Sequence, residues 1–247
     1  MKLKFVKRIN TLKDSIFYSL IHYNNKILGF GRKKYNSNEI IQVELNNSFD
    51  IIETYPNSIK GEDPRCFCYK NELYVLDNYS NKNIVINYKN KTSIPLNLKG
   101  KNRSFFSHNN LLYFIDYIKP FTLKILDVNT GKISDVSVVD NKKNLEYRGG
   151  TPGYKNKENE YYGYGHRTYK KDEVLKHDIF KWIIYFEKNK LPRIEHFDIE
   201  QPQNSKNICD PTSVIEIDKK KYLITAESVK PWFCKQDYVT NVYEIIE

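Results

Sequence analysis

The sequence contains no long hydrophobic segment. No apolar run approaches the roughly 20 residues that a membrane-spanning helix requires, and the longest runs, such as residues 111–115, have the length of a strand. The opening segment, residues 1–8, contains four basic residues and lacks the apolar core of a signal peptide. We therefore expect a soluble protein that acts in the cytoplasm.

Cysteine is also scarce, with four residues at positions 66, 68, 209 and 234. Cys66 and Cys68 are two residues apart, so in a strand they face the same side and suit neither a mutual disulfide nor a typical zinc loop. We expect all four to be reduced and to act as small apolar side chains. A bridge or metal site at Cys209 and Cys234 is the alternative. No spacing in the chain requires a metal, and no cofactor is expected.

The chain is strongly basic, with 40 Lys and Arg against 30 Asp and Glu and a net charge of +10. The basic residues are scattered over turns, as at residues 142–143 and 219–221. They form no helical stripe, zinc-finger spacing or aromatic run of the kind that binds nucleic acid. The excess positive charge instead favours an acidic or phosphorylated substrate.

A turn residue followed by an apolar run, often rich in Tyr, occurs five times. The central residues of these runs are Leu28, Tyr74, Tyr113, Tyr162 and Tyr222, which are 46, 39, 49 and 60 residues apart. The 20 Tyr and 13 Phe, with apolar periods mostly of two, favour strands over helices. Repeats of roughly 40 to 50 residues made of short strands are typical of β-propeller blades.

The sequence therefore predicts an all-β fold, a single five-bladed β-propeller domain over residues 1–247. The blades are expected at residues 14–55, 62–98, 102–139, 148–199 and 209–246. Blade four carries an insertion at 167–176, and a polar linker at 201–207 precedes blade five. A β-sandwich with irregular loops would also explain the strands, but not the five-fold placement of polar clusters.

These polar clusters would meet around the propeller axis. Arg, Lys and His can hold phosphate or carboxylate groups, and the face of a Trp can stack on a sugar ring. The candidates for binding a sugar or an anion are Arg32, Glu62, Arg65, Lys101, Asn102, Arg148, Thr151, His166, Arg167, His177 and Trp232. The candidate carboxylates for catalysis are Asp63, Asp210 and Glu227.

Several of these segments resemble the five-bladed propeller carbohydrate-active enzymes, especially the family 130 glycoside phosphorylases and hydrolases and related mannosyltransferases. The resemblance spans residues 14–246 and rests on Glu-Asp-Pro-Arg at 62–65, Lys-Asn at 101–102, Arg-Gly-Gly-Thr-Pro at 148–152, Gly-His-Arg at 165–167 and Asp-Pro-Thr-Ser at 210–213. It implies action on β-mannosides.

The chain departs from the family pattern at the start of blade three. Phosphorylases of this family are expected to have a catalytic Asp there, whereas this chain has no carboxylate in residues 101–104. Similar sequences often carry Glu before the Lys-Asn pair and Trp after it, where this chain has Gly100 and Arg103. Asp116 is the only nearby carboxylate.

We interpret the chain as a carbohydrate-active enzyme that makes or breaks a glycosidic bond in an axial funnel. Such chemistry needs a carboxyl group at the bridging oxygen, and we expect Asp63 in this role with Glu227 or Asp210 as its partner. The cationic candidates would bind phosphate or the diphosphate of a sugar nucleotide. Three alternatives stay open: a nucleotide-sugar glycosyltransferase of surface-glycan synthesis, a glycan-binding propeller without catalysis, and a protein-interaction propeller.

Overall fold

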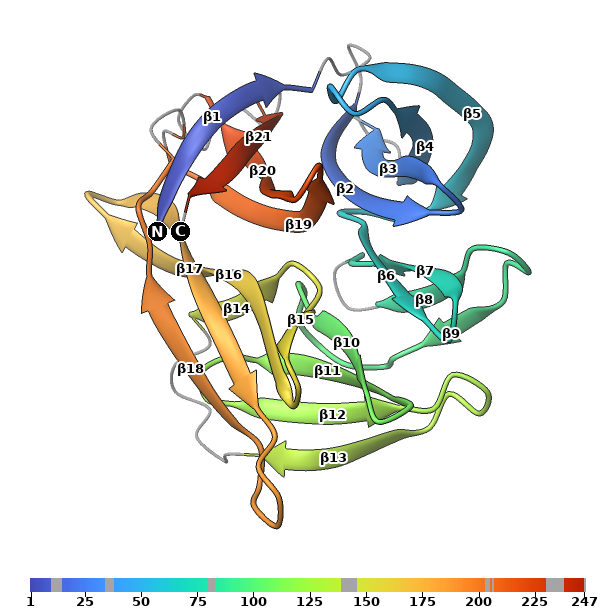
Figure 1. Cartoon of the computed structure of the whole chain (residues 1–247), viewed down its shortest axis with the longest axis vertical. Helices are drawn as coiled ribbons and strands as arrows, with labels where there is room; N and C mark the ends of the chain where they lie inside the picture. The colour runs from blue at the N-terminus through green and yellow to red at the C-terminus, as the bar shows by residue number, and fades with distance from the viewer. Residues whose placement is uncertain are drawn as a thin grey trace.

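The computed structural model describes residues 1–9, 15–33, 38–79, 83–138, 146–202, 205, 207–229 and 238–246. Within these ranges every regular element is a β-strand, and the strands form five antiparallel sheets around a common centre (Figure 1). The predicted all-β, five-bladed propeller is therefore confirmed. The described residues include no helix that is long and apolar enough to cross a membrane.

Blades one to three each consist of four strands that are consecutive in the sequence. Blade one contains β2 (Ser15–Tyr23), β3 (Lys26–Lys33), β4 (Glu39–Leu45) and β5 (Ile51–Lys60). Blade two contains β6 (Arg65–Tyr69), β7 (Glu72–Asp77), β8 (Ile84–Asn87) and β9 (Ser93–Pro95). Blade three contains β10 (Ser104–His108), β11 (Leu111–Tyr117), β12 (Thr122–Leu126) and β13 (Ile133–Val138).

Blades four and five depart from this simple order. Blade four contains β14 (Tyr147–Gly150), β16 (Glu160–Lys171), β17 (Val174–Tyr185) and β18 (Arg193–Asp198), and β15 (Tyr154–Lys157) also pairs with β16. Blade five contains β19 (Cys209–Ile217), β20 (Lys220–Ser228) and β21 (Tyr238–Ile246), and β1 (Lys2–Arg8) is its fourth strand.

The ring is closed by the pairing of β1 with β21, which places both chain ends in one blade (Figure 1). The expected blade ranges did not include β1. Leu3 and Phe5 alternate with Lys2 and Lys4, a period of two that indicates a strand. This segment lacks the consecutive apolar residues that mark the second strands of the blades, because β1 is an outer strand and most of its side chains are exposed.

The five apolar runs found in the sequence all lie in the second strand of a blade, in β3, β7, β11, β16 and β20. On β11, Leu112 and Phe114 pack against blade two, whereas Tyr113 and Ile115 pack against blade four. Successive side chains of a strand point to opposite faces. A second strand sandwiched between two blades therefore needs apolar residues at consecutive positions.

The insertion at residues 167–176 lengthens the hairpin between β16 and β17, and each strand has 12 residues. The aromatic and β-branched run at 180–186 lies mostly in β17. The extended hairpin carries His166 and His177 on paired strands, so it contributes directly to the centre described below.

Gly165 allows β16 to approach β14 closely, since an added Cβ would lie 2.2 Å from the carbonyl oxygen of Arg148. A backbone atom cannot rotate away. We expect Gly165→Ala to lower the free energy of unfolding by about 2 kcal/mol or more, as overpacking does. In Gly29→Ala the new Cβ would meet only side-chain atoms at 2.9–3.0 Å, so the loss should be smaller. Urea unfolding measures both, and equal losses would contradict this reason.

Candidate functional site

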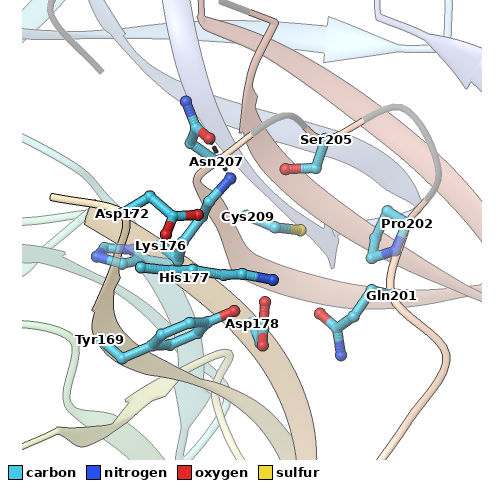
Figure 2. Close-up of a pocket in the computed structure, with 11 residues that line it drawn as sticks. Tyr169, Asp172, Lys176, His177, Asp178, Gln201, Pro202, Ser205, Asn207 and Cys209 are labelled. Atoms are coloured by element: carbon cyan, nitrogen blue, oxygen red, sulfur yellow. Dashed lines mark hydrogen bonds between the residues drawn. The ribbon is translucent and has the colours of Figure 1, made fainter. Parts of the chain in front are cut away.

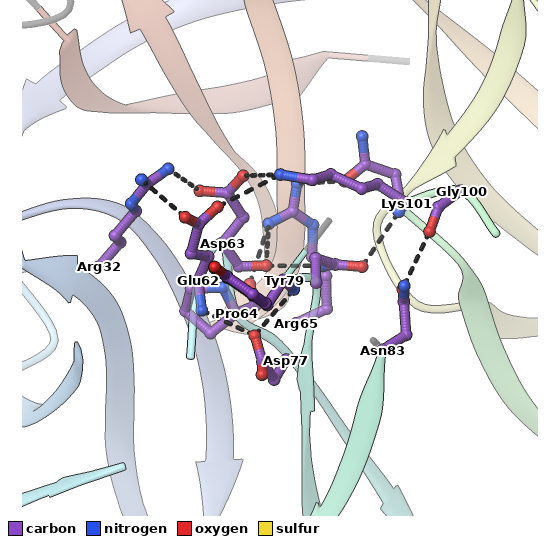
Figure 3. Close-up of polar contacts among 12 residues, drawn as sticks. Arg32, Glu62, Asp63, Pro64, Arg65, Asp77, Tyr79, Asn83, Gly100 and Lys101 are labelled. Carbon is purple, nitrogen blue, oxygen red and sulfur yellow. Dashed lines mark hydrogen bonds and ion pairs between the residues drawn. The ribbon is translucent and has the colours of Figure 1, made fainter. Parts of the chain in front are cut away.

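Four charged side chains from three blades form a closed ring of ion pairs at the entry to the first strands of blades two and three (Figure 3). Arg32, at the end of β3, lies 3.0 Å from Asp63 and 3.1 Å from Glu62. Lys101, just before β10, lies 3.4 Å from Asp63 and 3.3 Å from Glu62. We refer to these four residues as the four-charge ring. The two cations are 30% exposed, so solvent and ligands can reach the ring.

The loop that carries Glu62 and Asp63 is held in place by the end of β7. Asp77 accepts hydrogen bonds from the backbone N–H groups of Glu62 and Tyr79, at 2.7 and 2.9 Å. The Asn78 amide donates to the carbonyl oxygen of Asp63 at 2.6 Å. Asp63 itself has a φ of 45°, a conformation that Asp and Asn tolerate better than most residues. Asp77 and Asn78 were not among the candidate site residues. An Asp-Asn pair directly after an apolar strand is the sequence feature that could have identified them.

Arg65 lies beneath the ring and is almost fully buried, with 2% exposure. Its Nε donates to the carbonyl oxygen of Gly150 at 2.7 Å, and its Nη groups donate to Asn102 Oδ1 at 3.5 Å and to the carbonyl oxygen of Asp63 at 3.3 Å. Burial lowers the pKa of Arg65, while Asp63 and Asp210 oppose this change. Arg65 therefore joins blades two, three and four near the axis and is a buried cation between two carboxylates.

A second group, the His–Asp–His cluster, consists of His166, His177 and Asp210. Asp210 Oδ1 lies 2.6 Å from His177 Nδ1 and 3.5 Å from His166 Nδ1. The two imidazole rings are stacked, with centroids 4.6 Å apart and planes 18° from parallel. His166 is on β16 and His177 on β17 of blade four, whereas Asp210 is near the start of β19 in blade five.

The charge states of this cluster follow from burial and from its neighbours. Burial lowers the pKa of His166 to about 3, so this imidazole is neutral at pH 7. Burial alone would raise the pKa of Asp210, but His177, His166 and Arg65 outweigh it and lower the pKa well below its usual value. Since His166 is neutral, the Asp210 anion is stabilised mainly by His177 and Arg65. Arg148 is opposite His166 in the β14–β16 register and also lowers the pKa of His166.

The blade-three departures have structural reasons. Arg103 is 1% exposed and forms an ion pair with Asp116 in which Nε lies 2.8 Å from Oδ1. Its Nη groups donate to Asn83 Oδ1 and to the carbonyl oxygens of Lys99 and Gly100, at 2.7–3.0 Å. Gly100 has a φ of +104°, which favours glycine. Arg103 therefore holds the loop that presents Lys101, and Asp116 is the counter-ion of Arg103.

Three candidates that the structure describes lie outside these groups: Glu227, Thr151 and Arg167. Glu227 is fully buried and accepts hydrogen bonds from Thr225, Asn241 and Tyr243, all within blade five. Burial raises the pKa of Glu227, and these three donors oppose that rise.

The hydroxyl of Thr151 donates to the Pro152 carbonyl and accepts from the Tyr164 N–H, so it supports the turn after β14. Arg167 neighbours His166 on β16, so it points to the opposite face, where it pairs with Asp178 at 3.4 Å. Trp232 lies outside the described residues.

The cysteines in the described ranges, Cys66, Cys68 and Cys209, are free thiols. Burial raises the pKa of Cys66 and of Cys209, so neither is a reactive thiolate. Cys234 lies outside the described part of the chain, and the alternative bridge with Cys209 is untested.

A polar cavity of about 380 Å³ lies beside the His–Asp–His cluster, between blade four and the start of blade five (Figure 2). His177 and Cys209 belong to its wall, together with Tyr169, Lys176, Asp178 and Gln201. Lys176 donates to the side chain of Asn207, which fixes part of the rim. The cavity gives solvent access to the His177 side of the cluster.

A scan of protein-family models and a search of curated protein sequences both find no match to the chain. Solved structures do match. A hypothetical protein from Leishmania major has a TM-score of 0.67 at 10% identity, over 100% of this chain and 90% of that one. A mannose phosphorylase from Leishmania mexicana, solved with a phosphate ion, has a TM-score of 0.65 at 10% identity, over 98% and 86% of the two chains.

The native arabinanase from Bacillus subtilis has a TM-score of 0.61 at 12% identity, over 98% of this chain and 97% of that one. These five-bladed folds support the resemblance suggested by the sequence motifs. At such low identities the similarity establishes the fold alone.

Proposed function

We propose that the chain is a carbohydrate-active enzyme that makes or breaks a glycosidic bond near the propeller axis, with an anionic co-substrate. The observation that carries the proposal is the four-charge ring above buried Arg65. It places the Asp63 carboxylate, which is 15% exposed, between two cations that a ligand can reach. A carboxyl group and nearby cations are what glycosidic bond chemistry with phosphate or a diphosphate requires.

The balance of charge favours an anionic co-substrate over water alone. Around the axis, the cations Arg32, Arg65, Lys101 and Arg148 come from four blades, and the described carboxylates that act on them are Glu62, Asp63 and Asp210. A fourth carboxylate, Asp77, is buried beneath them and accepts two backbone N–H groups. The similar fold of a mannose phosphorylase solved with phosphate agrees with this chemistry. Phosphate with a β-mannoside is therefore the first pair to test.

A non-catalytic glycan-binding propeller is the second candidate, and one observation favours it. Within blade three itself, the carboxylate nearest the start in sequence is Asp116, which is 8% exposed and paired with Arg103. A family member that depends on a blade-three acid would be inactive with this arrangement. The two candidates differ in whether bound sugar is converted.

Product formation distinguishes them. The protein is incubated with β-manno-oligosaccharides and phosphate, and separately with acceptor sugars and nucleotide sugars, and the products are identified by mass spectrometry. A sugar phosphate or an elongated oligosaccharide supports the enzyme, and the productive condition identifies the co-substrate. Sugar binding without product supports the binding propeller, and neither binding nor product contradicts both.

Arg32→Met tests the cationic side of the ring. Because Arg32 would lose charged hydrogen bonds to an anion, we expect the KM for phosphate to rise by about 10-fold or more, with little change in the KM for the sugar. Lys33→Met is the matched control, since Lys33 is 45% exposed and pairs with Glu39 at the surface. Steady-state kinetics with each substrate varied measures the effect, and equal KM values in the two variants would contradict a role of Arg32.

A further inference from the structure

The His–Asp–His cluster contains a buried polar atom that its surroundings do not satisfy. His166 is 1% exposed, and its Nδ1 has no hydrogen-bond partner within the described residues. A buried nitrogen without a partner costs roughly 1–3 kcal/mol, so its presence requires a reason. The nitrogen lies 3.5 Å from Asp210 Oδ1, at the outer limit of a hydrogen bond, and does not form one with it.

We propose that His166, His177 and Asp210 bind one divalent first-row transition ion, with Zn²⁺ as the ion to test first. Each residue offers one ligand atom, and these three atoms lie within 4.8 Å of one another. Two imidazoles and one carboxylate are a ligand set that such ions prefer. The proposal does not depend on whether the chain acts on sugars.

One ligand separation already matches that of a bound site. In a tetrahedral zinc site with bonds of about 2.0–2.1 Å, neighbouring ligand atoms are about 3.4 Å apart. The separation between His166 Nδ1 and Asp210 Oδ1, 3.5 Å, already has this value. The His177–Asp210 contact of 2.6 Å is a hydrogen bond, which the ion would replace as the two residues separate by less than an ångström.

The surrounding charges select the kind of ion. Asp210 supplies one negative charge, while Arg65 and Arg148 add positive charge near the cluster. Hard ions such as Ca²⁺ and Mg²⁺ need several oxygen ligands, and their binding depends on the negative charge of those ligands. This cluster has only one carboxylate, so binding must come from the imidazole nitrogens, which favour Zn²⁺ and its neighbours.

The adjacent cavity provides a route for the ion. His177 lines it (Figure 2), whereas His166 is only 1% exposed and is not part of its wall. Three protein ligands leave a fourth position for water or a ligand, as in catalytic zinc sites.

The test uses the full chain after dialysis against a chelator. Isothermal titration with Zn²⁺ is expected to give one ion per chain at micromolar or tighter affinity. Co²⁺ should give visible absorption bands typical of tetrahedral nitrogen and oxygen ligands, and excess Ca²⁺ or Mg²⁺ should not displace it. His177→Ala and Asp210→Asn should each weaken binding by at least about 100-fold, the upper end of what losing a second-shell partner costs.

His196→Ala is the matched control, because His196 is exposed on β18 and its ring packs against the rings of Tyr147 and Phe180, away from the cluster's ligand atoms. It should bind Zn²⁺ like the unmodified protein. If the chain binds no Zn²⁺ at one equivalent, or if all three variants bind equally, the proposal is wrong. Circular dichroism verifies folding, and should one ligand variant not fold, the other variant and the Co²⁺ spectrum of the unmodified protein decide the outcome.

Discussion

Asp63→Asn is expected to reduce product formation by about 10²- to 10⁴-fold, the usual contribution of a positioned general acid or base. Asn is nearly isosteric with Asp and tolerates the positive φ of 45° at this position. It cannot exchange a proton with a glycosidic oxygen, and it removes one of the two negative charges of the four-charge ring. The loss should therefore appear in kcat while the protein remains folded.

Asp135→Asn is the matched control for this experiment. Asp135 lies on β13, the outer strand of blade three, where it pairs with Lys124 and is 62% exposed. It carries the same chemical change far from the axis and should leave turnover unchanged. If Asp63→Asn turned over substrate at the unmodified rate, Asp63 would not be the reacting carboxyl group, and Asp210 would be the next residue to test.

The fold could be predicted from the sequence because each blade contains a short apolar run, and this run recurs along the chain. Tyr113 and its counterparts in the other blades lie between two sheets, so consecutive apolar residues and a fixed spacing appear in the chain itself. The strand β1 was missed because it is an outer strand with an exposed face, and its partner β21 is more than 200 residues away in sequence, with Lys2 opposite Ile246.

The site could be predicted only in part from the sequence. The sequence shows which residue types are present, but not which hydrogen bonds and ion pairs their side chains form. The Arg32 and Lys101 pairs with Asp63 join successive blades, and because these residues are 31 and 38 positions apart in the chain, only the packing of neighbouring blades brings them together. His166 and Arg167 are neighbours in the chain but point to opposite faces of β16. Glu227 has the right chemistry, but its oxygens are used within blade five.

Arg103→Met is expected to destabilise the protein by about 3–5 kcal/mol, because it leaves Asp116 as a buried carboxylate without its counter-ion. The side chain of Arg103 is 0% exposed and that of Asp116 is 9% exposed. The change also removes the donors to Asn83 and to the Lys99 carbonyl. For a protein of this size the expected fall in Tm is about 6–20 °C.

The double variant Arg103→Met/Asp116→Leu should recover much of this loss, since replacing both members of a buried pair by apolar residues is often neutral. Arg193→Met is the control, because Arg193 is 49% exposed and its surface ion pairs should contribute less than about 1 kcal/mol. Urea unfolding of the single and double variants gives the coupling between the two residues. Additive losses would contradict the assignment of Asp116 as the counter-ion of Arg103.

Asp116→Asn connects this stability argument to catalysis. If Asp116 only neutralises Arg103, the variant should lose stability, while turnover per folded molecule stays within about two-fold, because it removes no group that touches the substrate. If Asp116 instead replaces the blade-three acid of the family pattern, turnover should fall as far as in Asp63→Asn. The burial of Asp116 and its 2.8 Å contact with Arg103 favour the first result. Turnover rates per folded molecule therefore show whether Asp116 only neutralises Arg103 or takes part in the reaction.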